Sequence, residues 1–158
     1  MAHKTILTAD DGKQDIHITR VFDLPLELLF KAFSESALVE QWMGTKVLTL
    51  ENRQHGGYRF ETTDPRGNKH RFHGVIHEYS VNTKIIRTFE IEGAPFGAQL
   101  EYLEFEQLTA ETSKLLMQTI FRSNELRDHM LQLPFAQGIS SAHNRLQDIV
   151  GKLYRSDR

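Results

Sequence analysis

The sequence predicts an α+β domain in which a curved antiparallel sheet of about seven strands wraps around one long C-terminal helix. Three features of the chain support this fold class. Most of residues 46–122 alternate apolar with polar side chains between short turn signals. A short helical stretch separates this region from an earlier strand, and the chain ends in one long amphipathic helical pattern. Strands that follow one another without intervening helices pair as hairpins, so the sheet is expected to be antiparallel.

The N-terminal part is predicted to hold one strand and two short helices. Apolar and polar residues alternate over Asp15–Asp23, which is typical of a strand with one buried face. Pro25 suits the first turn of a helix, and apolar residues at helical spacing follow it. A second short helix comes next, and we expect Ser34 or Ser36 to cap it and Gly44 to end it.

The central region is predicted to consist of hairpin strands. Residues that favour turns delimit them: Gly56 and Gly57, Asp64 to Asn68, Asn82, Gly93 to Gly97, and Thr109 to Glu111. A long strand is predicted at Lys69–Tyr79. Alternation places Phe72 and Ile76 on one face of this strand and Val75 and Tyr79 on the other.

The last part of the chain is predicted to be helical. Ser123 or Asn124 can cap a first helical turn or two, which Pro134 then interrupts. The long helix is predicted from Gly138 onward. Its apolar stripe, which would pack on the sheet, consists of Ile139, Ala142, His143, Leu146, Ile149, Val150 and Leu153.

Composition and charge limit the function classes. With 158 residues, the chain is expected to form a single domain over residues 1–158. The net charge is −2 and no cluster of cations is present, which argues against nucleic acid as a partner. No segment has the length and hydrophobicity of a membrane span, and the N-terminal residues lack the pattern of a signal or transit peptide. We therefore expect a cytoplasmic protein without a membrane partner.

No cofactor or metal is expected. The absence of cysteine excludes disulfides, thiol nucleophiles and thiolate metal sites. His70, His73 and His77 resemble a metal cluster, but in a strand His73 and His77 lie about 13 Å apart and His70 points to the other face. We expect these histidines to be solvated. Three acidic residues of a later strand are likewise expected to face solvent: Glu101, Glu104 and Glu106.

The predicted architecture implies an internal space. Seven strands span about 30 Å, whereas a helix with its side chains is only about 10 Å wide, so one helix does not cover the sheet. The remaining concave face is closed either by bulky side chains that fill a dry core or by a ligand. Large residues available for either role are Phe30, Phe33, Trp42, Tyr58, Phe60, Phe72, Ile76, Phe89, Met117 and Phe121.

Four segments carry a resemblance to a known family: LPLELLFKAFSESALVEQWMG, HGGYRFETTDPRGNKHRFHGVIHEY, IIRTFEIEGAPFG and FRSNELRDHMLQLPFAQG. In their order and spacing, over about residues 16–150, the chain resembles the activator-of-heat-shock-protein-90-ATPase homologue branch of the START-like, or SRPBCC, superfamily. The resemblance implies a helix-grip fold with an internal cavity. Residues that match the family pattern are Trp42, Gly56, Gly57, Gly74, Glu78 and Gly138. The chain departs from the pattern at Met43, Thr45, Ala136 and His143.

The leading functional hypothesis is therefore the binding of a small hydrophobic or amphipathic ligand between the sheet and the long helix, without catalysis. The ligand-binding residues predicted are Phe30, Phe33, Trp42, Tyr58, Phe60, Phe72, Ile76, Glu78, Phe89, Met117, Ile139 and His143. An alternative for His143 is a buried core residue without a role in binding.

Two other functions stay open at this point. Some START-like relatives are aromatases or cyclases, and the acids and bases of such an enzyme would be His143, Glu78, Arg53 and Tyr58. The family name also implies a protein-binding module that activates a chaperone ATPase and takes part in a stress response. A homodimer formed through sheet edges or helix ends is compatible with the sequence.

Overall fold

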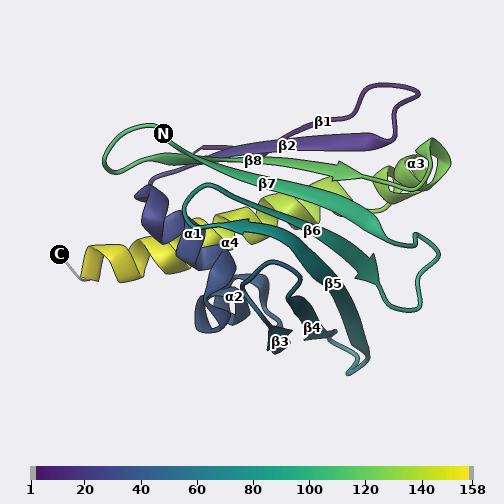
Figure 1. Ribbon diagram of the computed structural model, residues 1–158, viewed down its shortest axis with the longest axis horizontal. Helices are drawn as coiled ribbons and strands as arrows, with labels where there is room; N and C mark the ends of the chain where they lie inside the picture. Colours follow the sequence, from purple (N-terminus) through teal and green to yellow (C-terminus); the bar gives the residue numbers. More distant parts are fainter. Residues whose placement is uncertain (1–2, 157–158) are drawn as a thin grey trace.

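The computed structural model describes residues 3–156, which form one antiparallel sheet of eight strands and four helices (Figure 1). In chain order the elements are β1 (Ile6–Thr8), β2 (Asp15–Phe22), α1 (Leu26–Ser34), α2 (Ser36–Met43), β3 (Lys46–Leu50), β4 (Gly57–Thr63), β5 (Lys69–Ser80), β6 (Lys84–Ile91), β7 (Gln99–Gln107), β8 (Ser113–Ile120), α3 (Asn124–Gln132) and α4 (Phe135–Ser156). The predicted fold class is confirmed. Within residues 3–156, no helix is long and apolar enough to cross a membrane.

The strand order across the sheet is β1-β2-β8-β7-β6-β5-β4-β3. Strands β3 to β8 are joined as successive hairpins, β2 pairs with β8, and β1 pairs with β2 at the edge of the sheet. Helix α4 runs along the concave face, while α1 and α2 cover one end of it (Figure 1). The sequence prediction lacked β1, because a strand of three residues shows too little alternation to be recognised.

The ends of the helices differ in detail from the prediction. Gly44 ends α2 in the left-handed conformation, and Ser123 caps α3 by accepting a hydrogen bond from the Leu126 amide, as expected. The expectation that Ser34 or Ser36 caps α2 is wrong, because the N-cap is Glu35 and the Ser34 hydroxyl donates to the Phe30 carbonyl instead. The long helix begins at Phe135, directly after Pro134, and not at Gly138.

A β-bulge in β5 corrects the predicted faces of this strand. The register with β6 shifts between Ile76 and Glu78, so that His77 has no partner of its own in the ladder. Residues after the bulge therefore exchange faces. Tyr79, predicted on the face of Val75, packs instead against the buried ring of Phe30.

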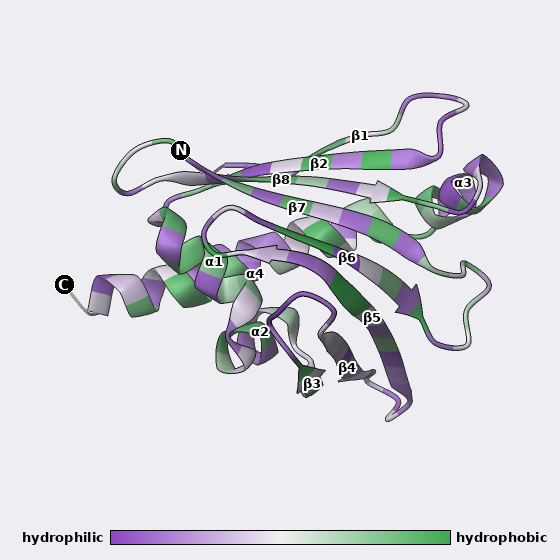
Figure 2. Ribbon diagram, viewed as in Figure 1, coloured by the Kyte–Doolittle hydropathy of each residue, from purple (hydrophilic) through white to green (hydrophobic). Residues whose placement is uncertain are grey.

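The buried side of the sheet is strongly apolar. Figure 2 shows hydrophobic and hydrophilic residues alternating along the strands, as a sheet with one buried face requires. The larger core cluster joins α1, α2 and the middle of the sheet to α4, and it includes Phe22, Phe30, Trp42, Phe60, Leu103 and Leu146. A smaller cluster lies towards α3 and includes Ile16, Ile18, Phe96, Phe121 and Met130. The space described next lies between these two clusters.

Candidate ligand-binding cavity

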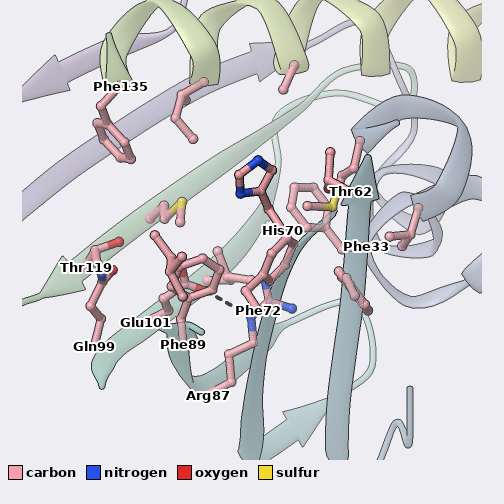
Figure 3. Close-up of a pocket in the computed structure, with 18 of the residues that line it drawn as sticks. Phe33, Thr62, His70, Phe72, Arg87, Phe89, Gln99, Glu101, Thr119 and Phe135 are labelled. Carbon is pink, nitrogen blue, oxygen red and sulfur yellow. Dashed lines mark hydrogen bonds and ion pairs between the residues drawn. The ribbon is translucent and has the colours of Figure 1, made fainter. Parts of the chain in front are cut away.

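A cavity of about 510 Å³ lies between the sheet and α4 (Figure 3). Its walls come from strands β4 to β8, from α1 and α2 through Phe33 and Trp42, and from α4 through Ile139, Ala142 and His143. The lining is mainly apolar and rich in aromatic rings. Its volume falls in the range of roughly 300–1,000 Å³ that is usual for small-molecule sites.

Most of the residues that the sequence predicted for the site line this cavity. They are Phe33, Trp42, Phe60, Phe72, Phe89, Met117, Ile139 and His143. Each lies where the predicted alternation or helical spacing placed it, on the concave face of the sheet or on the sheet side of a helix. Phe121 is buried in the smaller core cluster and is absent from the lining.

Three predicted apolar residues lie in the core beside the cavity and not on its wall. Phe30 packs edge-on against Tyr79 and Phe105, with ring centroids 5.5 and 5.1 Å apart. The Tyr58 hydroxyl donates to the Thr88 carbonyl, and burial raises the pKa of this phenol. Ile76 is almost fully buried within the same cluster. These side chains support the wall but do not form its surface.

Glu78 lies outside the cavity, contrary to the prediction. Its carboxylate pairs with the Lys84 ammonium at 3.2 Å, and the two side chains are 41% and 38% exposed. The bulge at His77 is the physical reason, since it turns Glu78 to the outer face of the sheet. Strict alternation from Phe72 would have placed this carboxylate inside.

The candidates for acid–base catalysis are not brought together. Arg53 is exposed in the loop between β3 and β4, where it contacts Glu51 at 3.4 Å. Glu78 faces outward and Tyr58 is held by a backbone carbonyl. Of the four, only His143 lines the cavity. The cyclase alternative therefore has no catalytic constellation made of these residues.

A buried ion pair joins the neighbouring strands β6 and β7 at the cavity wall. The Arg87 Nε donates to the Glu101 carboxylate at 2.9 Å, and the two side chains are 10% and 7% exposed. The guanidinium also lies 4.8 Å from the centroid of the Tyr58 ring. The expectation that Glu101 faces solvent is wrong. It shares its face of β7 with buried Leu103 and Phe105, and this spacing of two residues was the signal that sequence reasoning missed.

Two polar groups beside this ion pair lack partners. The Gln99 Nε2 and the Thr119 Oγ1 are buried and make no hydrogen bond within residues 3–156. Gln99 is 3% exposed and Thr119 2% exposed, and both side chains line the cavity. Thr119 is directly opposite Glu101 in the ladder of β7 and β8, and Glu101 is opposite Arg87 in the ladder of β6 and β7. Arg87, Glu101 and Thr119 thus form a continuous polar row across three neighbouring strands of the otherwise apolar concave face.

His143 is a neutral side chain on the helix side of the cavity. Its Nδ1 lies 2.8 Å from the Thr5 hydroxyl, which also accepts a hydrogen bond from Arg20. Burial, together with the nearby charge of Arg20, lowers the pKa of His143 to about 4. The imidazole is therefore uncharged at neutral pH.

Two further ionisable residues of the lining contact carboxylates. Arg71 Nε lies 2.7 Å from the Glu61 carboxylate, and His70 Nε2 lies 2.9 Å from the Asp64 carboxylate. The expectation that His70 is only a solvated outer residue is incomplete, because its exposed ring also lines the cavity (Figure 3). Among the described residues, no group of acidic and histidine side chains is placed to hold a metal ion.

Comparisons with known proteins agree with this architecture. The profile of the family described as "Activator of Hsp90 ATPase homolog 1-like protein" matches residues 23–151. No curated protein matches the sequence at a significant level.

Several solved structures have the same fold. A crystal structure of a Rhodobacter sphaeroides protein has a TM-score of 0.85 at 19% identity, over 94% of this chain and 99% of that chain. The crystal structure of protein Ms6760 from Mycobacterium smegmatis has a TM-score of 0.83 at 16% identity, over 92% of this chain and 96% of that chain. The solution structure of a protein from Arthrobacter aurescens has a TM-score of 0.84 at 16% identity, over 93% of this chain and 91% of that chain. At these identities the likeness establishes the helix-grip fold alone.

Proposed function

The chain belongs to the Activator of Hsp90 ATPase homolog 1-like family, and from this premise we propose that it binds a small hydrophobic or amphipathic molecule in the cavity between the sheet and α4. The observation that carries the proposal is the cavity itself. An apolar space of about 510 Å³ has the size of a small-molecule site, whereas the voids within close-packed protein interiors rarely exceed a water molecule.

The chemistry of the lining supports an apolar guest. Aromatic rings from β4, β5 and β6 meet on one wall, represented by Phe60, Phe72 and Phe89, with centroids 5.0–5.3 Å apart between successive rings. Without a guest, the apolar surface of these rings is in contact with water, which is unfavourable. A guest of matching shape removes this surface and its own apolar surface from water, at about 25 cal/mol per Å².

The test is a titration with N-phenyl-1-naphthylamine, a neutral apolar probe whose fluorescence rises when it leaves water. Trp42 is the only tryptophan of the chain, is 5% exposed and lines the cavity. Energy transfer from Trp42 to the probe therefore reports that the probe is bound to the protein, and the variants described next locate it. We expect saturable binding of one probe per chain, with a matching loss of Trp42 emission.

Two variants on neighbouring residues of α4 locate the bound probe. Ala142 lines the cavity, so Ala142→Phe places a ring in the space and should weaken probe binding at least tenfold. Ser141 is exposed on the other side of the helix, so Ser141→Phe adds the same ring without changing the cavity. Equal weakening by both variants, or no binding by the parent protein, would refute the proposal.

A ligand from the host would be the most direct support. Native mass spectrometry of protein purified from its own host should detect a retained small molecule in the parent protein and not in Ala142→Phe. The family description offers one alternative, activation of the Hsp90 ATPase. A stimulated chaperone ATPase rate that is unaffected by Ala142→Phe would favour that alternative over a ligand carrier.

A further inference from the structure

We propose that the cavity selects neutral molecules that carry a hydroxyl or carbonyl oxygen, and that this oxygen is hydrogen-bonded by Gln99 and Thr119 at the end of the cavity formed by β7 and β8. This inference rests on the proposed function, because it names the class of ligand that the same cavity takes.

Both side chains have unmet hydrogen-bonding capacity. Buried polar atoms are almost always hydrogen-bonded, since an unpaired one costs the full free energy of its desolvation. Gln99 Nε2 and Thr119 Oγ1 are both buried and both lack a partner within residues 3–156. Both also line the cavity, so an oxygen of a guest can reach them where no described protein group does.

The register of the sheet places these two side chains on neighbouring strands at the same end of the cavity (Figure 3). Gln99 begins β7, and Thr119 lies opposite Glu101, the next inward-facing residue of that strand. Figure 3 shows Gln99, Glu101 and Thr119 at one end of the cavity, away from Phe33 and Thr62. An amide donates through nitrogen and accepts through oxygen, and a hydroxyl does both. The pair can therefore hold either a carbonyl or a hydroxyl oxygen.

The polar end of the cavity offers no unpaired charge among the described lining residues. The Arg87 guanidinium beside this polar end is already neutralised by Glu101 at 2.9 Å, and Arg71 and His70 are paired with carboxylates outside the cavity. His143 adds no charge at neutral pH. A carboxylate or ammonium group of a guest placed at this polar end would thus lose its hydration without gaining a counter-ion there. The cavity should discriminate against both signs of charge.

The experiment uses one molecular frame with different polar groups: diphenylmethane, benzophenone, benzhydrol, diphenylacetate and benzhydrylamine. Dissociation constants come from displacement of N-phenyl-1-naphthylamine, checked by calorimetry. Benzophenone and benzhydrol should bind about tenfold more tightly than diphenylmethane, as expected for a hydrogen bond made in a buried site. Diphenylacetate and benzhydrylamine should bind at least tenfold more weakly than benzophenone.

Two variants assign the preference to the two side chains. The double variant Gln99→Met/Thr119→Val keeps the shape of the wall and removes its hydrogen-bonding groups. It should retain diphenylmethane binding and lose the preference for benzophenone. The control is Thr62→Val, the same change at a cavity-lining threonine whose hydroxyl is already bonded to Thr45 at 3.1 Å. This control should keep the preference.

The outcomes separate this inference from the function on which it rests. Equal binding of benzophenone and diphenylmethane by the parent protein would overturn the inference and leave apolar binding standing. The inference would also be overturned if the double variant kept the preference for benzophenone over diphenylmethane. The same holds if diphenylacetate or benzhydrylamine bound as tightly as benzophenone. If neither the probe nor any diphenyl compound binds, the proposed function fails and the inference fails with it.

Discussion

Replacing Glu101 by glutamine should be among the most damaging single changes on the cavity wall. The substitution keeps the size of the side chain but leaves the Arg87 guanidinium without its counter-ion, at a site where the two side chains are only 10% and 7% exposed. Removal of one partner from a buried ion pair costs about 3–5 kcal/mol. The nearby Tyr58 ring, 4.8 Å from the guanidinium, offsets part of this loss, which leaves about 3 kcal/mol.

The loss is large enough to measure without ambiguity. For a domain of this length 1 kcal/mol corresponds to about 2–4 °C in Tm, so Glu101→Gln should lower Tm by about 6–12 °C. Urea denaturation followed through Trp42 emission gives the free energy of unfolding, and circular dichroism gives Tm. The double variant Arg87→Met/Glu101→Leu replaces both charges by apolar groups and should lie within about 1 kcal/mol of the parent protein.

The matched control is Glu78→Gln, which makes the same substitution in the ion pair with Lys84. Those two side chains are 41% and 38% exposed, and an exposed pair contributes at most about 1 kcal/mol. If Glu101→Gln destabilises the protein no more than Glu78→Gln does, the pair at the cavity wall is solvated and the reasoning on burial is refuted.

Three further predictions concern hydroxyls, protonation and glycines. Thr119→Val removes a buried hydroxyl that has no partner among the described residues, and it should stabilise the empty protein by about 1 kcal/mol. Ser113→Ala removes a hydroxyl bonded to the Leu24 carbonyl and should destabilise the protein by about as much. If urea titrations show that both variants change the free energy of unfolding in the same direction, this prediction is wrong. The pKa of His143 is about 4 in the folded chain and about 6.5 when unfolded, so the unfolded state takes up this proton first as the pH falls. As the pH falls from 6.5 to 4, the free energy of unfolding of the parent protein should therefore decrease by up to about 3 kcal/mol relative to that of His143→Asn. A difference in unfolding free energy between the two proteins that stays constant over this pH range would refute the prediction. Gly74→Ala should destabilise by at least about 2 kcal/mol, because its Cβ would lie 2.0 Å from the Thr88 carbonyl oxygen, while Gly138→Ala meets open space in α4 and should stabilise slightly in thermal melts.

The fold was predictable because its signals are periodic and long. The hairpin strands and the stripe of α4 each repeat over many residues, so that errors at single positions did not change the architecture. What failed was local. The three residues of β1 are too few to show a period, and the cap of α2 depended on Ser34, whose hydroxyl is used inside α1.

The site was predicted less completely, for a related reason. Alternation identifies which apolar side chains of the strands face the concave side, and it found Phe60, Phe72 and Phe89. Helical spacing found Phe33 in the same way. Alternation assumes that the register continues, and the bulge at His77 therefore moved Glu78 out of the predicted site. No periodicity distinguishes Phe30 or Tyr58 in the core from their neighbours on the cavity wall, because that difference depends on packing between distant strands.

The polar row formed by Arg87, Glu101 and Thr119 is informative because these residues depart from the apolar pattern of the concave face. A sequence optimised for stability alone would place apolar residues at Arg87, Glu101 and Thr119, since all three face the concave side in the middle of the sheet. A charge pair in this position contributes little net stability, and an unpaired hydroxyl reduces it. Residues that break the local pattern at a cost in stability are expected where a site exists, so Glu101 in the run LEYLEFE is informative because it occupies a position where the pattern calls for an apolar residue. If the proposed function holds, this mismatch identifies, better than any aromatic residue does, the end of the cavity where the polar part of a guest would bind.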